Sequence, residues 1–194
     1  MTSSNQRIEK NSYLSDSSMI HKILKPILKR LIFFLLLVIS FGFTGCASHK
    51  KINRLAQEMD CRKTILFLYD EAGDSVIMER KGFSAGNSPY PDYKLTMQKS
   101  IEELNKHTTA NLLFRQSLGF PSDSVIQVKV LIKDITWTFG VWSALMETEL
   151  IYQLDNKKID ITGENKVYLA GTKKGNLFKS LKDGHYQLLN YICK

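Results

Sequence analysis

A short apolar run near the start of the sequence limits what the rest of the chain can be. The run covers residues 31–43 and follows two cations, Lys29 and Arg30. It is too short for a membrane-spanning helix, which needs about 20 apolar residues. A cationic flank, an apolar core of this length and small residues after it are instead the parts of a secretory signal. We therefore expect the folded part of the protein to follow this run and to lie outside the cytoplasm.

The end of the run carries a more specific pattern. The residues Phe43-Thr44-Gly45-Cys46 resemble the lipobox of bacterial lipoproteins, with Phe43 where Leu, Val or Ile is usual. The resemblance implies that the Cys46 thiol receives a diacylglycerol, that the chain is cut before Cys46 and that its new amino group is acylated. Two or more hydrocarbon chains give stable residence in a membrane. An uncleaved N-terminal anchor or a plain cleaved signal is the alternative.

The resemblance also implies a place in the cell. In bacterial lipoproteins an Asp after the cysteine retains the protein in the inner membrane, whereas this chain has Ala47. We therefore expect a lipid-anchored protein of the bacterial cell envelope, on the outer membrane and facing the periplasm. Residues 1–45 are the signal peptide in this interpretation. Met19 is a candidate for the true start, because the polar segment before it exceeds what a signal peptide needs.

The charge of the chain after the lipobox excludes one class of partner. Of the 27 basic and 19 acidic residues, six and two lie before Cys46, which leaves a net charge of about +4. Nucleic-acid-binding proteins carry a clustered basic excess, so we expect no nucleic acid partner. The rest of the chain suits one domain. We divide it into a lipidated tether with a short helix, 46–63, and a folded domain, 64–194.

Two cysteines follow Cys46 in the sequence. They are Cys61 and Cys193, at the start and the end of the expected domain. In an oxidising periplasm an even pair of cysteines favours a disulfide. Two separately buried thiols are the alternative.

The first half of the domain has one strand pattern and one helix pattern. Residues 64–70 are apolar on both faces and predict an internal strand, and 75–80 can return beside it as a hairpin partner. A helical period then predicts a helix over 95–118, ending before Gly119 and Pro121.

The second half predicts a meander and a closing helix. Residues 125–139 alternate between apolar and polar, and the parity reverses near Lys133 and Asp134, which predicts a β-bulge there. The later elements expected are a strand over 145–154, a strand over 159–163 that 166–170 extends or follows, and a helix over 176–193.

This order of elements predicts an α+β fold with two layers. One layer is an antiparallel sheet, and helices pack mainly on one of its faces. The same order resembles small outer-membrane lipoproteins whose domain is similar to the N-terminal domain of TolB. Some of those proteins activate cell-wall synthases in the periplasm, so the resemblance implies a role through protein partners.

Aromatic side chains are the candidates for a partner-binding surface. They are Tyr90 and Tyr93 in the irregular segment 81–93, and Trp137, Phe139 and Trp142 around the turn at 140–141. If exposed, the three at the turn form an apolar patch suited to a protein partner or a bilayer, and the two tyrosines offer contacts of the kind enriched at interfaces. If the segment folds back and the helices cover the turn, they belong to the core, which the size of the rings favours.

No motif in the sequence specifies catalysis. The imidazoles after Cys46 are His49, His107 and His185, and His185 lies on the apolar stripe of the last expected helix. Patterns for hydrolases, phosphate-binding loops and zinc sites do not occur. We therefore expect no catalytic residue, no metal and no cofactor beyond the lipid on Cys46.

These observations favour a non-catalytic envelope lipoprotein that binds a protein partner, in envelope assembly or maintenance. One alternative is a carrier or chaperone for an apolar ligand, held in a cavity between the sheet and the helices. The other is a hydrolase that uses Cys61 or Cys193 with His185.

Overall fold

A computed structural model describes residues 47–69, 76–82, 89–116, 124–168 and 171–194. All of these lie in one compact unit, Gly42–Lys194. The expected signal peptide, Cys46 and part of the irregular segment 81–93 lie outside the described residues. Among the described helices, none is long and apolar enough to cross a membrane.

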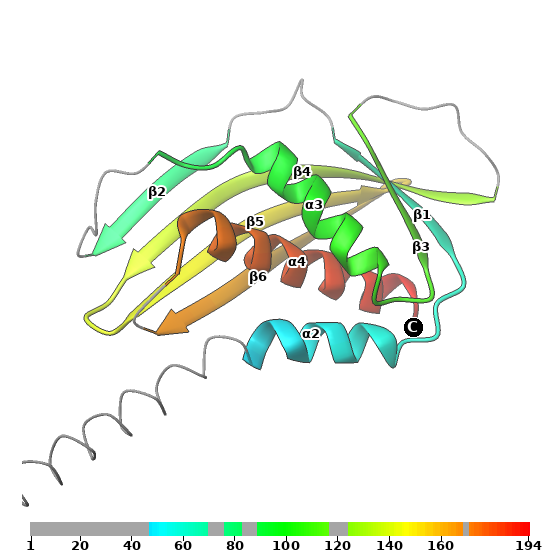
Figure 1. Cartoon of the computed structure of the whole chain (residues 1–194). Coiled ribbons are helices and arrows are strands. Elements are labelled where there is room, and N and C mark those ends of the chain that lie inside the picture. Colours follow the sequence, from blue (N-terminus) through cyan, green and yellow to red (C-terminus); the bar gives the residue numbers. More distant parts are fainter. Residues whose placement is uncertain (1–46, 70–75, 83–88, 117–123, 169–170) are drawn as a thin grey trace, which may run out of the picture. The chain divides into compact units, whose positions relative to one another are not determined.

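In the described residues three helices accompany a sheet of six strands, so the predicted α+β class is confirmed (Figure 1). The helices are α2 (Ala47–Gln57), α3 (Tyr93–Asn105) and α4 (Lys173–Ile192). The strands are β1 (Thr64–Tyr69), β2 (Ile77–Gly82), β3 (Asn111–Arg115), β4 (Val125–Phe139), β5 (Ser143–Leu154) and β6 (Lys157–Tyr168). Helices α3 and α4 lie side by side on one face of the sheet, and α2 packs against α4.

The sheet is mixed, so the prediction of an antiparallel sheet was wrong. Its order is β3-β1-β4-β5-β6, and β1 runs parallel to both of its neighbours. β2 is not a hairpin partner of β1, because it pairs in parallel with β4. Tyr69 pairs with Val130 and Ile77 with Asp134, so β1 and β2 follow the same edge of β4 one after the other. The apolar character of β1 on both faces is typical of a parallel strand with neighbours on both sides.

The predicted helix over 95–118 is a helix followed by a strand. Asp92 caps α3 by accepting a hydrogen bond from the Leu95 amide, 2.9 Å away. After α3 ends, the Asn105 side chain accepts a bond from the Leu112 amide at 2.7 Å, which directs the chain into β3. Leu112 is buried and its neighbour Leu113 is exposed. An apolar residue at position 112 fits both the period of a helix and the alternation of a strand. The sequence therefore did not distinguish one long helix from a helix followed by a strand.

The meander β4-β5-β6 and its bulge are confirmed. Pairing of β4 with β5 shifts register between Ile132 and Asp134. The bulge keeps Ile132 on the helix-facing side and brings Ile135 and Trp137 to the same side, where all three are buried. β6 is continuous to Tyr168, so the two strand segments expected there are one.

Helix α4 approaches β6 closely at two glycines. A Cβ on Gly163 would overlap the carbonyl oxygen of Ser180 and lie 2.8 Å from the amide nitrogen of Gly184. The close approach brings the hydroxyls of Thr148 and Ser180 within 2.7 Å of each other in the core. Gly163 therefore sets the distance between the last helix and the sheet.

The sequence left two states open for Cys61 and Cys193, a disulfide or two separately buried thiols. In the structure a disulfide joins them. The Cα atoms of the pair are 5.4 Å apart, and the two cysteines are 132 positions apart in the chain. Nearby, Lys63 Nζ donates a hydrogen bond to the Ile192 carbonyl at 2.7 Å. The segment between α2 and β1 is thus fastened to the end of α4.

Candidate functional site

Three of the aromatic residues expected at a binding surface pack together with a lysine. Trp137 is buried and Phe139 is half-buried, with their ring centroids 4.4 Å apart. The Lys173 ammonium lies 4.1 Å from the Tyr90 ring centroid and 5.3 Å from that of Trp137, within the range of cation–π attraction. The Tyr90 hydroxyl donates to the Glu79 carbonyl at 2.6 Å. These rings stabilise the junction of β2, β4 and α4.

The remaining two aromatic candidates lie elsewhere. Tyr93 is the first residue of α3, half-buried against the core. Trp142 lies in the turn between β4 and β5, where its side chain is 71% exposed and that of Val141 is 75% exposed. Of the five aromatic candidates, Trp142 is therefore exposed, Trp137 is buried, and the other three are half-buried against the core. We call residues 140–142 the β4–β5 tip.

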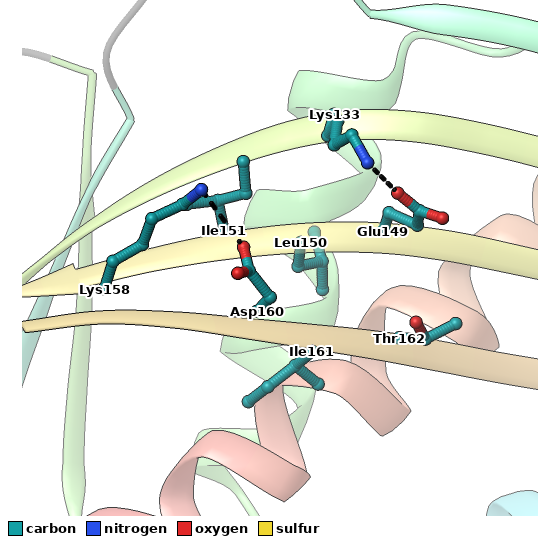
Figure 2. A pocket seen from close by; sticks show the side chains of 8 residues that line it. All are labelled: Lys133, Glu149, Leu150, Ile151, Lys158, Asp160, Ile161 and Thr162. Atoms are coloured by element: carbon teal, nitrogen blue, oxygen red, sulfur yellow. Dashed lines mark hydrogen bonds and ion pairs between the residues drawn. The ribbon is translucent and has the colours of Figure 1, made fainter.

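The face of β4, β5 and β6 that points away from the helices carries a pocket of about 350 Å³ (Figure 2). Its lining residues are Lys133, Glu149, Leu150, Ile151, Lys158, Asp160, Ile161 and Thr162, of which Leu150 and Ile161 direct their side chains into the core on the other side of the sheet. Register places Leu131, Ile151 and Asp160 in one row across the three strands. We call this surface the outer face.

Ion pairs flank the pocket on neighbouring strands (Figure 2). The Lys133 ammonium lies 2.6 Å from a Glu149 carboxylate oxygen, and that of Lys158 lies 3.5 Å from a carboxylate oxygen of Asp160. Half-buried Ile151 supplies apolar surface between them. An apolar centre with a charged rim can hold an apolar side chain and orient charged groups beside it.

His185 occupies the position that the sequence predicted, in the core. Its Nδ1 lies 2.7 Å from the Tyr152 hydroxyl, and its ring meets Phe67 edge-on at 5.4 Å between centroids. Complete burial lowers the pKa of His185 to about 3 and raises the pKa of Tyr152. Near neutral pH the imidazole is uncharged, and its Nε2 has no hydrogen-bond partner among the described residues.

The Cys–His hydrolase hypothesis is not supported by this arrangement. Cys61 and Cys193 are bonded to each other, so neither presents a thiolate. The pocket opens on the outer face and not between the sheet and the helices, which is where the carrier hypothesis expects its ligand. In the described ranges no group of three or more His, Cys, Asp or Glu side chains could hold a metal.

A polar cluster that the sequence did not predict joins the three helices. Lys182 of α4 is buried and donates to the side chain of Asn53 in α2. His107, just after α3, lies with Nε2 3.0 Å from Asn53 Nδ2 and 3.2 Å from a carboxylate oxygen of Glu103. Burial lowers the pKa of Lys182 to about 8. The cluster fixes α2 against α3 and α4.

Comparison with known proteins leaves the function open. No protein-family model matches the chain, and no curated protein matches its sequence. One similar solved structure is an uncharacterized protein, 12% identical, covering 69% of this chain and 92% of its own at a TM-score of 0.37. Another is a neuraminyllactose-binding hemagglutinin homolog from Helicobacter pylori, 9% identical, covering 71% and 84% at a TM-score of 0.34. These scores are too low to support an argument about fold or function.

Proposed function

We propose that the chain is a lipoprotein of the bacterial cell envelope, anchored by diacylglycerol and an N-acyl chain on Cys46. It faces the periplasm from the outer membrane. Its domain binds a protein partner without catalysing a reaction, in the assembly or maintenance of the envelope. The lipobox that ends at Cys46 supports the anchor. The outer face, where Ile151 lies in a pocket flanked by two ion pairs, is the observation that supports the partner.

The dimensions of the outer face suit a protein partner. β5 and β6 have 12 residues each, and a strand of that length extends about 40 Å. Three strands are about 15 Å wide at the usual spacing, which gives an area of roughly 600 Å². A standard protein interface buries about 800 Å² on each partner. The outer face alone therefore provides most of the area that such an interface needs.

Replacing Cys46 with Ser should abolish lipidation. A serine cannot form the thioether to diacylglycerol, so unprocessed precursor should accumulate and labelling by a fatty-acid probe should fall to background. Gel mobility and probe incorporation in growing cells measure both effects. Ala47→Ser is the matched control and should be labelled like the wild type. Continued labelling of Cys46→Ser would refute the anchor.

A photo-cross-linking residue in place of Thr162 should capture a discrete envelope protein. Thr162 is exposed and lines the pocket. The same residue in place of Lys99, exposed on α3, is the control and should give no such product. Adding Ile151→Asp should abolish the Thr162 product, because a carboxylate would replace the apolar centre. Equal capture from both positions, or capture that survives Ile151→Asp, would contradict binding at the outer face.

A further inference from the structure

Helix α2 starts directly after the expected lipidation site. Its first residue is Ala47, which is bonded to Cys46. Residues 47–51, expected as a polar tether, form the first turns of this helix. Lipids on Cys46 would therefore hold the beginning of α2 at the membrane surface, without a flexible linker between them.

Contacts along α2 show that it runs parallel to α4. Near its start, the rings of His49 and Phe178 lie 5.9 Å apart. Further along, Lys182 donates to Asn53, and after the helix ends Cys61 is bonded to Cys193. The first turns of α2 and α4 therefore lie next to each other, as Figure 1 shows.

The first turns of α4 lie at the end of the sheet that carries the β4–β5 tip. Asn176 of α4 accepts a hydrogen bond from the Asn165 side chain at 3.1 Å, and Asn165 pairs with Met146 of β5. Trp142 precedes Met146 by four residues, which is about 14 Å along a strand. The start of α2 and the tip are thus at the same end of the sheet (Figure 1).

Exposed apolar and aromatic side chains gather at this end. Val141 and Trp142 form the tip, and Tyr168, 46% exposed, pairs with Ser143 beside it. Trp and Tyr are enriched where proteins meet the boundary between lipid and water, because their rings combine apolar surface with a polar group.

Exposed lysines surround the same end. They are Lys50 and Lys51 in α2, Lys81 at the end of β2, Lys166 in β6 and Lys174 in α4. The exposed Glu164 lies two residues before Lys166, and Glu79 is paired with Lys81 at 2.9 Å. The cations outnumber these carboxylates, and lysines close to a bilayer are attracted to anionic headgroups.

We propose that Val141 and Trp142 insert into the headgroup region of the leaflet that holds the Cys46 lipids. The surrounding lysines then contact anionic headgroups. The bilayer contacts the domain at two places, the start of α2 and the tip, and this fixes the orientation of the domain on the membrane. The inference rests on the proposed lipidation of Cys46 and does not depend on the partner at the outer face.

Tryptophan quenching by brominated lipids tests this contact. Bromine quenches only nearby indoles, and the sequence has two tryptophans, of which Trp137 is 7% exposed. The lipidated protein is placed in vesicles of phosphatidylethanolamine and phosphatidylglycerol that carry bromine near the headgroup end of the acyl chains. We expect the tryptophan emission of the wild type to fall about twofold in these vesicles. Its maximum should lie to the blue of that in detergent-free buffer, because the Trp142 ring leaves water for the headgroup region. Trp142→Phe, which retains only the core Trp137, should show no quenching.

Two further measurements separate this inference from the proposed function. Mass spectrometry of the purified protein reports lipidation of Cys46. Val141→Glu retains both tryptophans and should weaken the quenching, because its carboxylate opposes insertion next to Trp142. Lipidated wild type that is quenched no more than Trp142→Phe would overturn the bilayer contact and leave the anchor intact. Absence of lipid on Cys46 would overturn both.

Discussion

Removing the Cys61–Cys193 disulfide should lower the free energy of unfolding by about 4 kcal/mol. The bond closes a loop over a sequence separation of 132 residues, and a cross-link over so long a loop removes much conformational freedom from the unfolded chain. It also fastens the segment after α2 to the end of α4. Without it, the fraying of α4 at Ile192 and of the chain at Lys63 should increase.

Urea unfolding of the protein with both cysteines changed to Ala measures this effect. The midpoint should move to lower urea relative to the oxidised wild type. Wild type treated with a reductant is the matched control and should unfold near the midpoint of the double variant. The same midpoint for oxidised wild type and double variant would show that the bond contributes nothing to stability. Because α2 directly follows Cys46, the proposed lipidation site, loss of the disulfide would also loosen the contact between the domain and the helix that we propose to be anchored.

Local periodicity was sufficient to predict the meander and its bulge. In β4, the change of parity around Lys133 is visible in the sequence, because alternate side chains of a strand point to opposite faces of the sheet. The parallel pairing of β1 was not predictable in the same way. A strand that is apolar on both faces, as 65–69 is, requires cover on both sides but does not specify which strands lie beside it. Pairing over such separations depends on the whole fold.

The candidate sites depended on contacts between segments far apart in the chain. Trp137 continues the alternation of β4 with Ile135, so its burial could be predicted from the sequence. Trp142 lies beyond the last paired residues of that strand, so the alternation does not predict its burial or exposure. The pocket on the outer face is formed by three strands in a particular register, with Lys133 at the bulge. No local pattern specifies such an arrangement, nor the approach of Lys173 to Tyr90.

Gly163→Ala should be among the most destabilising single substitutions in the domain. Alanine is ordinarily the better residue in a strand, since glycine weakens strands. Here the added Cβ would overlap the Ser180 carbonyl oxygen and lie 2.8 Å from the Gly184 amide nitrogen. Both are helix backbone, which cannot rotate aside, so α4 must move away from β6. We expect a loss of about 3 kcal/mol, or roughly 10 °C in melting temperature.

Thermal unfolding of alanine variants at three glycines measures this effect, and the variants at Gly184 and Gly140 are the comparison for Gly163→Ala. A Cβ on Gly184 would overlap the end of the flexible Leu150 side chain, which can rotate, so Gly184→Ala should cost less than Gly163→Ala. A Cβ on Gly140 would lie 3.4 Å from the nearest atoms of Ser143, an ordinary contact, so Gly140→Ala should change stability by less than about 0.5 kcal/mol. This order follows from backbone contact at Gly163 and side-chain contact at Gly184. Equal stability of Gly163→Ala and Gly140→Ala would mean that α4 does not approach β6 closely at Gly163. The buried contact between the Thr148 and Ser180 hydroxyls, which depends on that approach, would then also be contradicted.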